Sequence, residues 1–132
     1  MKERSSPEIT TPGSRGNRHV TIYHNPACGT SRNALEAIRG AGLEPQIVRY
    51  LDVGWRREQL ISLLKQMGLG PRDILRVRGS QAEALGLTGS EVSDEAILGA
   101  MVNQPILVER PIVVSWKGAA LCRPWQRVQD LL

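Results

Sequence analysis

A short polar segment around Cys28 separates a β-branched run from a helical pattern, and it constrains the fold more than any other feature of the sequence. The run from His19 to Tyr23 is typical of a strand, and the pattern from Ser31 to Ala41 is typical of a helix. Pro, Gly, Thr and Asn between them are turn-forming residues. The sequence therefore predicts a strand, a tight turn and a helix, with a cysteine at the junction.

A cysteine at such a junction has a distinctive electrostatic setting. Unpaired N–H groups and the helix dipole favour an anion at a helix N-terminus, so they favour thiolate over thiol. His24 and Arg32, four residues before and after Cys28, can add positive charge. The alternative is a buried, inert cysteine in a first turn, but the polar neighbours of Cys28 favour a reactive one.

The elements that follow indicate an α/β fold. Gln46 to Leu51 is predicted to be a second strand, parallel to the first because a helix joins the two. Ile112 to Trp116 and Ala119 to Cys122 form a predicted hairpin around a turn at Lys117-Gly118. A last helix is expected after Pro124.

Between the second strand and the hairpin the sequence is helical. Predicted helices or turns span Arg57 to Met67, Pro71 to Leu75, Gln81 to Leu85 and Glu95 to Val102, the last capped by Ser93. The order βαβ, helices, ββα predicts a thioredoxin-like α/β sandwich, with a mixed four-stranded sheet and a helical insertion in the middle. We expect residues 1–18 to be a disordered leader and residues 19–132 to be one domain.

Charge and cysteine content limit the function classes. The net charge of +4 comes from 17 basic and 13 acidic residues. Residues 1–18 supply +2 of this charge, and the +2 that remains on the rest of the chain is too little to indicate nucleic-acid binding. No apolar run is long enough to span a membrane. The two cysteines have dissimilar settings, which favours a reduced, cytoplasmic protein.

The segment Cys28-Gly29-Thr30-Ser31 carries a serine where a thioredoxin-type centre has its second cysteine. We expect Ser31 to cap the helix and its hydroxyl to donate to the Cys28 sulfur, which would lower the thiol pKa; a cap alone is the alternative. The second thiol of any redox reaction must then come from Cys122 or from outside the chain. A cysteine phosphatase is excluded by spacing, because such enzymes place Arg six residues after Cys, where this chain has Ala34.

Attack on an oxyanion by a thiolate requires cationic donors. Arg110 precedes Pro111 just before a predicted strand, and Arg123 follows the hairpin beside Pro124. Both fall at ends of the predicted sheet, where α/β folds bind ligands. The Arg110–Pro111 peptide bond is a candidate for the cis form.

Four blocks of sequence, in order and at matching spacing, resemble the glutaredoxin-dependent arsenate reductases (ArsC family). They are Tyr23 to Asn33, Ile74 to Arg76, Pro105 to Val114 and Leu121 to Pro124. The resemblance implies a thioredoxin-like fold with an inserted helical region. It also implies that Cys28 attacks arsenate as a thiolate, that glutathione then enters, and that glutaredoxin resolves the mixed disulfide and releases arsenite.

The same resemblance assigns roles to individual positions. It makes Arg76, Arg110 and Arg123 the oxyanion-binding arginines, His24 a residue that lowers the pKa of Cys28, and Ser31 and Arg32 the residues of the nucleophile loop. Cys122 is expected to be structural.

The expected partners are arsenate, glutathione as co-substrate and glutaredoxin, with no bound cofactor, no metal, no nucleic acid and no membrane, in a monomer. Two alternatives remain. One is a redox-sensing transcription regulator of the same fold that binds RNA polymerase, although such regulators typically keep Cys-x-x-Cys. The other is a reductase-like protein that acts on another oxyanion.

Overall fold

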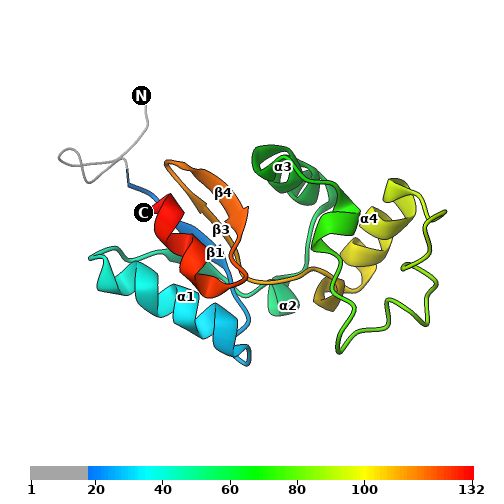
Figure 1. Cartoon of the computed structure of the whole chain (residues 1–132), viewed down its shortest axis with the longest axis horizontal. Coiled ribbons are helices and arrows are strands. Elements are labelled where there is room, and N and C mark those ends of the chain that lie inside the picture. Colours follow the sequence, from blue (N-terminus) through cyan, green and yellow to red (C-terminus); the bar gives the residue numbers. More distant parts are fainter. Residues whose placement is uncertain (1–17) are drawn as a thin grey trace.

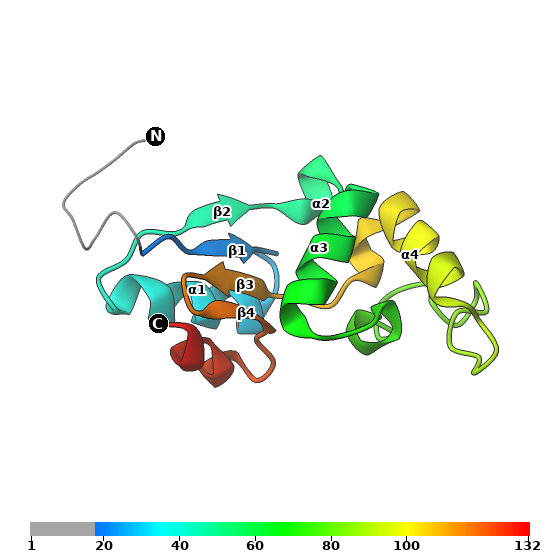
Figure 2. The same cartoon turned by 90° about the horizontal axis from the view of Figure 1, so that it is seen from above.

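The sheet has four strands in the order β2-β1-β3-β4, seen in a computed structural model that describes residues 18–132 (Figures 1 and 2). The strands are β1 (Thr21–Tyr23), β2 (Gln46–Val48), β3 (Ile112–Ser115) and β4 (Gly118–Leu121). β1 pairs with β2 in parallel, and the other two pairings are antiparallel. This confirms the predicted mixed sheet. Residues 1–17 of the predicted leader lie outside the described residues.

Helices pack on both faces of this sheet. The α-helices are α1 (Gly29–Gly40), α2 (Tyr50–Val53), α3 (Arg57–Met67) and α4 (Asp94–Asn103). Three 3-10 helices complete the described part, namely η3 (Pro71–Ile74), η4 (Pro105–Leu107) and η5 (Trp125–Leu131). Helices α2 to α4 come between β2 and β3 and gather beside one end of the sheet (Figure 2), as the predicted helical insertion requires.

The core consists of two clusters because neighbouring strand residues point to opposite faces. Ile22 and Val113, which are register partners, pack with Ala34 and Ile38 of α1 and Val128 of η5. The other cluster lies under α3 and α4 and takes in the buried leucines and isoleucines of the insertion together with Ile112. The two clusters make a sandwich of helices, sheet and helices, which confirms the predicted fold class.

The second strand and the last helix differ from the prediction in extent or type. The strand predicted from Gln46 to Leu51 ends at Val48, because Tyr50 begins α2 and its ring is fully buried. The last helix is a 3-10 helix. The segment from Gln81 to Leu85 makes the single turn that the sequence predicts, closed by a hydrogen bond from Leu85 N–H to the Gln81 carbonyl at 2.9 Å. No sequence pattern predicted η4.

The strand register brings four chain segments together at one edge of the sheet, the edge formed by the ends of the strands and not by an outer strand. Tyr23, the last residue of β1, pairs with Val48 at the end of β2 and with Ile112 at the start of β3. Ile112 in turn pairs with Leu121 at the end of β4. The segments that follow β1, β2 and β4 and the segment that precedes β3 therefore meet at this edge. Within residues 18–132, no helix is long and apolar enough to cross a membrane.

Candidate active site

Cys28 lies in the loop between β1 and α1 and is the N-cap residue of that helix. Its N–H donates to the Asn25 carbonyl at 3.0 Å, and its carbonyl accepts the N–H of Arg32 at 3.0 Å. The thiol is free and half-buried. The loop thus places the sulfur beside the open N–H groups of the first helical turn, as expected from the sequence.

The pKa of Cys28 is lowered from 9.0 to about 7. Partial burial works in the opposite direction, since it disfavours the charged form. It is outweighed by the Ser31 backbone N–H and by the guanidinium groups of Arg110 and Arg123. At neutral pH this lowered pKa gives Cys28 a much larger share of thiolate, the nucleophilic form, than an ordinary cysteine has.

Arg110 precedes β3 and Arg123 follows β4, so both lie at the open end of the β3–β4 hairpin, beside the thiol. Arg123 Nη1 lies 3.9 Å from Cys28 Sγ and donates to the Arg110 carbonyl at 2.9 Å. The peptide bonds that follow both arginines, to Pro111 and to Pro124, are cis. Arg110 is 9% exposed, and its Nε and Nη1 atoms have no hydrogen-bond partner among the described residues. A buried donor without a partner destabilises the folded protein by about 1–3 kcal/mol. An anion bound here could accept hydrogen bonds from both atoms.

Arg76 comes from the insertion and is held by Glu109. An isolated antiparallel bridge between Leu75 and Val108 places the two side by side. Arg76 Nη1 donates to Glu109 Oε1 at 2.8 Å, and Arg123 Nε lies 4.0 Å from the same oxygen. Glu109 therefore orients two of the three predicted oxyanion-binding arginines. Sequence reasoning missed it, although it directly precedes Arg110.

His24 and Ser31 form a buried pair under the loop. Ser31 Oγ lies 2.6 Å from His24 Nδ1 and accepts the N–H of Asn25 at 3.1 Å. Burial, followed by repulsion from Arg49, Arg32 and Arg39, lowers the pKa of His24 from 6.5. His24 is therefore neutral at pH 7, and the expectation that it adds positive charge is wrong.

The expectation that Ser31 caps the helix is also wrong. Cys28 is the N-cap, and Ser31 lies in the first turn of α1. Of the two polar groups of Ser31, the backbone N–H lowers the pKa of the thiol, while the hydroxyl is hydrogen-bonded to His24. The Ser31 side chain thus stabilises the loop through His24 and the Asn25 N–H, and it does not contact the sulfur.

Arg32 also acts on the loop. Its guanidinium donates to the Pro26 carbonyl at 2.9 Å and is not among the groups that lower the pKa of Cys28. Inside the loop, Asn25 Oδ1 accepts the N–H of Ala27 at 3.0 Å, a local turn of the kind asparagine favours. Sequence reasoning did not assign this role to Asn25.

Cys122 lies at the base of the hairpin and faces the core. It is fully buried, and burial raises its pKa to about 12. At neutral pH it is a thiol without access to solvent. This agrees with the structural role expected for it.

Together these groups have the chemical features that nucleophilic attack on a tetrahedral oxyanion requires. A thiolate stands beside two guanidinium groups, one of them with unused buried donors, and a third guanidinium is held nearby by Glu109. Such an arrangement can neutralise the oxyanion while the sulfur approaches its central atom. Within the described part of the chain, no group of three or more His, Cys, Asp or Glu residues is placed to hold a metal ion.

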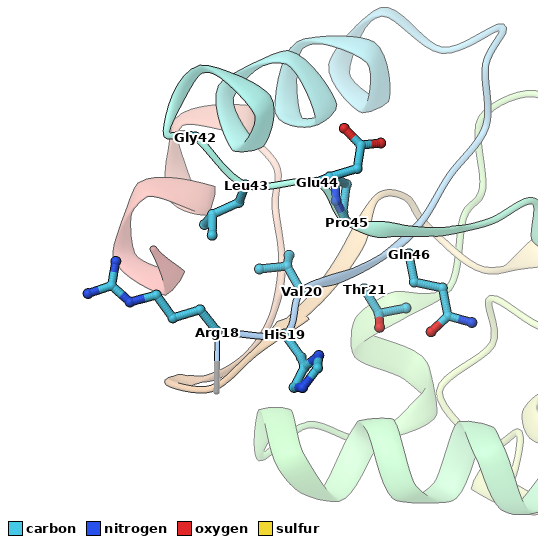
Figure 3. Close-up of a pocket in the computed structure, with 9 residues that line it drawn as sticks. All are labelled: Arg18, His19, Val20, Thr21, Gly42, Leu43, Glu44, Pro45 and Gln46. Atoms are coloured by element: carbon cyan, nitrogen blue, oxygen red, sulfur yellow. The ribbon is translucent and has the colours of Figure 1, made fainter. Parts of the chain in front are cut away.

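A separate hollow of about 520 Å³ lies at the opposite end of β1 and β2 (Figure 3). Its lining includes Arg18, Thr21, Glu44 and Gln46. These residues precede or begin the two strands, whereas Cys28 follows the end of β1. The hollow is therefore not part of the thiol site.

The chain is similar in sequence and in fold to known proteins. The profile of the ArsC family matches residues 23–131. Arsenate reductase ArsI2 from Synechocystis is 50% identical over 113 residues, which are 86% of this chain and 81% of that protein. An arsenate reductase from Escherichia coli is 46% identical over 114 residues, with 86% and 81% of the two chains covered. The solved structure of an arsenate reductase from Vibrio cholerae superimposes with a TM-score of 0.82 at 38% identity and covers 87% of this chain and 98% of that one.

Proposed function

This chain belongs to the ArsC family, and from that premise we propose that it is an arsenate reductase whose nucleophile is the Cys28 thiolate. The observation that carries the proposal is a half-buried thiol with a pKa of about 7, set against Arg110 and Arg123. Arsenate at neutral pH carries one to two negative charges. The guanidinium groups would offset the repulsion between that charge and the thiolate.

In the first step Cys28 attacks the arsenic of arsenate in its singly charged, doubly protonated form. A sulfur–arsenic bond forms and one arsenic–oxygen bond breaks. The oxygen leaves as water with both protons of the ion, so arsenic stays pentavalent. Arg76, Arg110 and Arg123 would hold the three remaining oxygens, which carry the two negative charges of the adduct.

Reduction to trivalent arsenic needs two electrons, and we propose that external thiols supply the remaining reducing power. When a second thiol joins the first in a disulfide, the electron pair of the sulfur–arsenic bond stays on arsenic. Cys122 cannot be that second thiol, because it is buried and has a pKa of about 12, and the sequence holds no other cysteine besides Cys28. Glutathione as co-substrate, followed by glutaredoxin, fits this requirement for a thiol from outside the chain.

A pair of cysteine variants tests the assignment of the nucleophile. Cys28→Ser should lose at least about 1,000-fold in arsenite production, because a serine hydroxyl is a far weaker nucleophile at neutral pH. Cys122→Ser is the matched control and should retain most of the activity, after allowance for any loss of stability in the core. Both proteins are assayed with arsenate, glutathione and glutaredoxin, and their folding is checked by circular dichroism.

Two results would contradict the assignment. Residual arsenate-dependent turnover in Cys28→Ser, within tenfold of the unmodified protein, would remove Cys28 from the reaction. Loss of turnover in a folded Cys122→Ser protein, with Cys28→Ser still active, would move the chemistry to the other thiol.

A further inference from the structure

Tyr50 carries a buried hydroxyl that the proposed mechanism does not use. The residue begins α2, its side chain is fully buried, and its ring stacks on Trp55 with centroids 5.2 Å apart and planes at 27°. Its hydroxyl has no hydrogen-bond partner among residues 18–132. A buried hydroxyl in a folded protein normally has a partner, so an unpaired one needs an explanation.

The strand register places Tyr50 at the same sheet edge as Cys28. Tyr50 follows the end of β2 by two residues, and Arg110 precedes the start of β3 by two residues. The two strands flank β1, because Val48 and Ile112 both pair with Tyr23. The loop that carries Cys28 leaves β1 at that point. Tyr50 and Arg110 therefore approach the thiol from the strands on either side of it.

The chemical character of the neighbours defines what the hydroxyl lacks. Burial raises the pKa of Tyr50, while the guanidinium groups of Arg110 and Arg76 lower it and the Cys28 sulfur raises it. The tyrosine therefore stays protonated at neutral pH. A guanidinium offers only N–H donors, so Arg110 can donate to the hydroxyl oxygen but cannot accept its hydrogen. What the hydroxyl lacks is an acceptor.

Arg110 has the same requirement, since its Nε and Nη1 atoms are also buried without a partner in the described part of the chain. Three buried donors on two neighbouring residues thus await acceptors beside one thiol. A tetrahedral oxyanion supplies several acceptor oxygens at once. A single apolar group or a cation would leave all three unsatisfied.

We propose that the Tyr50 hydroxyl donates a hydrogen bond to the oxyanion bound against Arg110 and Cys28. This inference rests on the proposed function and adds a neutral donor to the three arginines. A neutral donor on a rigid ring adds no charge, but it fixes the position of the oxygen that accepts its hydrogen bond. Tyr50 would therefore favour an oxyanion whose oxygen reaches that position while the central atom lies against the Cys28 sulfur. Its ring is fixed by Trp55 on one side and by the surrounding core.

The test compares Tyr50→Phe with Tyr23→Phe. Both tyrosines pack against Trp55, the rings of Tyr23 and Trp55 being 5.1 Å apart, but only the Tyr50 hydroxyl is a buried unpaired donor. The rate of Cys28 alkylation by iodoacetamide is measured with increasing inorganic arsenate, and in parallel with inorganic phosphate, without any reductant. The oxyanion concentration that halves the rate reports occupancy of the site and requires no turnover.

Tyr50→Phe should raise that concentration by about 10- to 100-fold, as expected for loss of one buried hydrogen bond to a charged acceptor. Tyr23→Phe should leave it within twofold. The oxyanion-free Tyr50→Phe protein should melt at the same temperature as the unmodified protein or higher, because the change removes an unpaired buried hydroxyl. Weaker oxyanion binding without a loss of stability is a combination that a purely structural hydroxyl would not give.

Three outcomes would overturn the proposal. These are equal protection of Tyr50→Phe and the unmodified protein, a marked fall in the melting temperature or failure to fold in Tyr50→Phe, and no protection of the unmodified protein by either oxyanion. The proposed reductase activity is judged separately, by arsenite production. A protein that shows the Tyr50 effect on protection but makes no arsenite would keep this inference and lose the proposed function.

Discussion

The reactivity of Cys28 depends on donors that belong to other residues. Its pKa reaches about 7 although partial burial opposes this, because the Ser31 N–H and two guanidinium groups stabilise the anion. His24, which the sequence suggested as a source of positive charge, is neutral and instead forms a hydrogen bond with the Ser31 hydroxyl. The thiolate is therefore stabilised by arginines from the hairpin and by backbone from α1.

The lowered pKa of Cys28 predicts a specific pH dependence of its reactivity. The fraction of thiolate grows as the pH rises through the pKa, so alkylation of Cys28 should be about tenfold faster at pH 8 than at pH 6 and should level off above about pH 8. Cys122, with a pKa of about 12, should stay unmodified in the folded protein. The modified residue is identified by mass spectrometry. A rate that still rises about fivefold between pH 8 and pH 9 would show that the thiol keeps its ordinary pKa of 9.0.

Individual site residues differed in how far the sequence could predict them. Cys28, Arg110 and Arg123 could be placed from their positions at predicted strand ends. Arg76 came only from the family resemblance, because nothing local sets it apart from the other arginines. Tyr50 was included in a predicted strand, and its unpaired hydroxyl depends on burial by residues distant in the sequence, which no local pattern reveals.

The four strands are short, and they position the site because the ends of β1, β2 and β4 lie beside the start of β3. β1 and β2 have three residues each, and β3 and β4 have four. The sequence predicted all four strands, the parallel pairing of β1 with β2 and the antiparallel hairpin of β3 and β4, since β-branched runs, a connecting helix and a Gly turn are strong signals. It did not predict that β1 pairs with β3. It missed the boundary at Val48 and the helix η4, because burial of Tyr50 and the bridge from Leu75 to Val108 are tertiary effects.

Two glycine variants test the helices of the insertion. Gly68 ends α3 in the left-handed region with φ +70°, so Gly68→Ala should lower the free energy of unfolding by about 1 kcal/mol. Gly99 lies inside α4 with open space where a Cβ would stand, so Gly99→Ala should raise it by about 0.5–1 kcal/mol. Urea denaturation followed by circular dichroism measures both. Changes of the same sign in the two variants would contradict the helix boundaries.

At the scale of the whole molecule, the sandwich and the insertion supply different parts of one site. Cys28 precedes α1, and Arg110 and Arg123 directly flank the β3–β4 hairpin, whereas Tyr50 and Arg76 belong to the helical insertion. Charge is concentrated locally at this junction, while the chain as a whole carries only +4. The site therefore depends on the docking of the insertion against the sheet edge, where Glu109 joins Arg76 to Arg123.

The most direct test of the proposed reductase is arsenite production from arsenate by the purified protein, with glutathione and glutaredoxin each omitted in turn. Cys28 is the only accessible thiol of the described chain, so we expect turnover with both reductants and at least a tenfold loss when either is left out. Undiminished turnover without external thiols would contradict the single-cysteine mechanism. Absence of turnover with both present, from a folded protein whose Cys28 still alkylates with a pKa near 7, would contradict the reductase assignment itself.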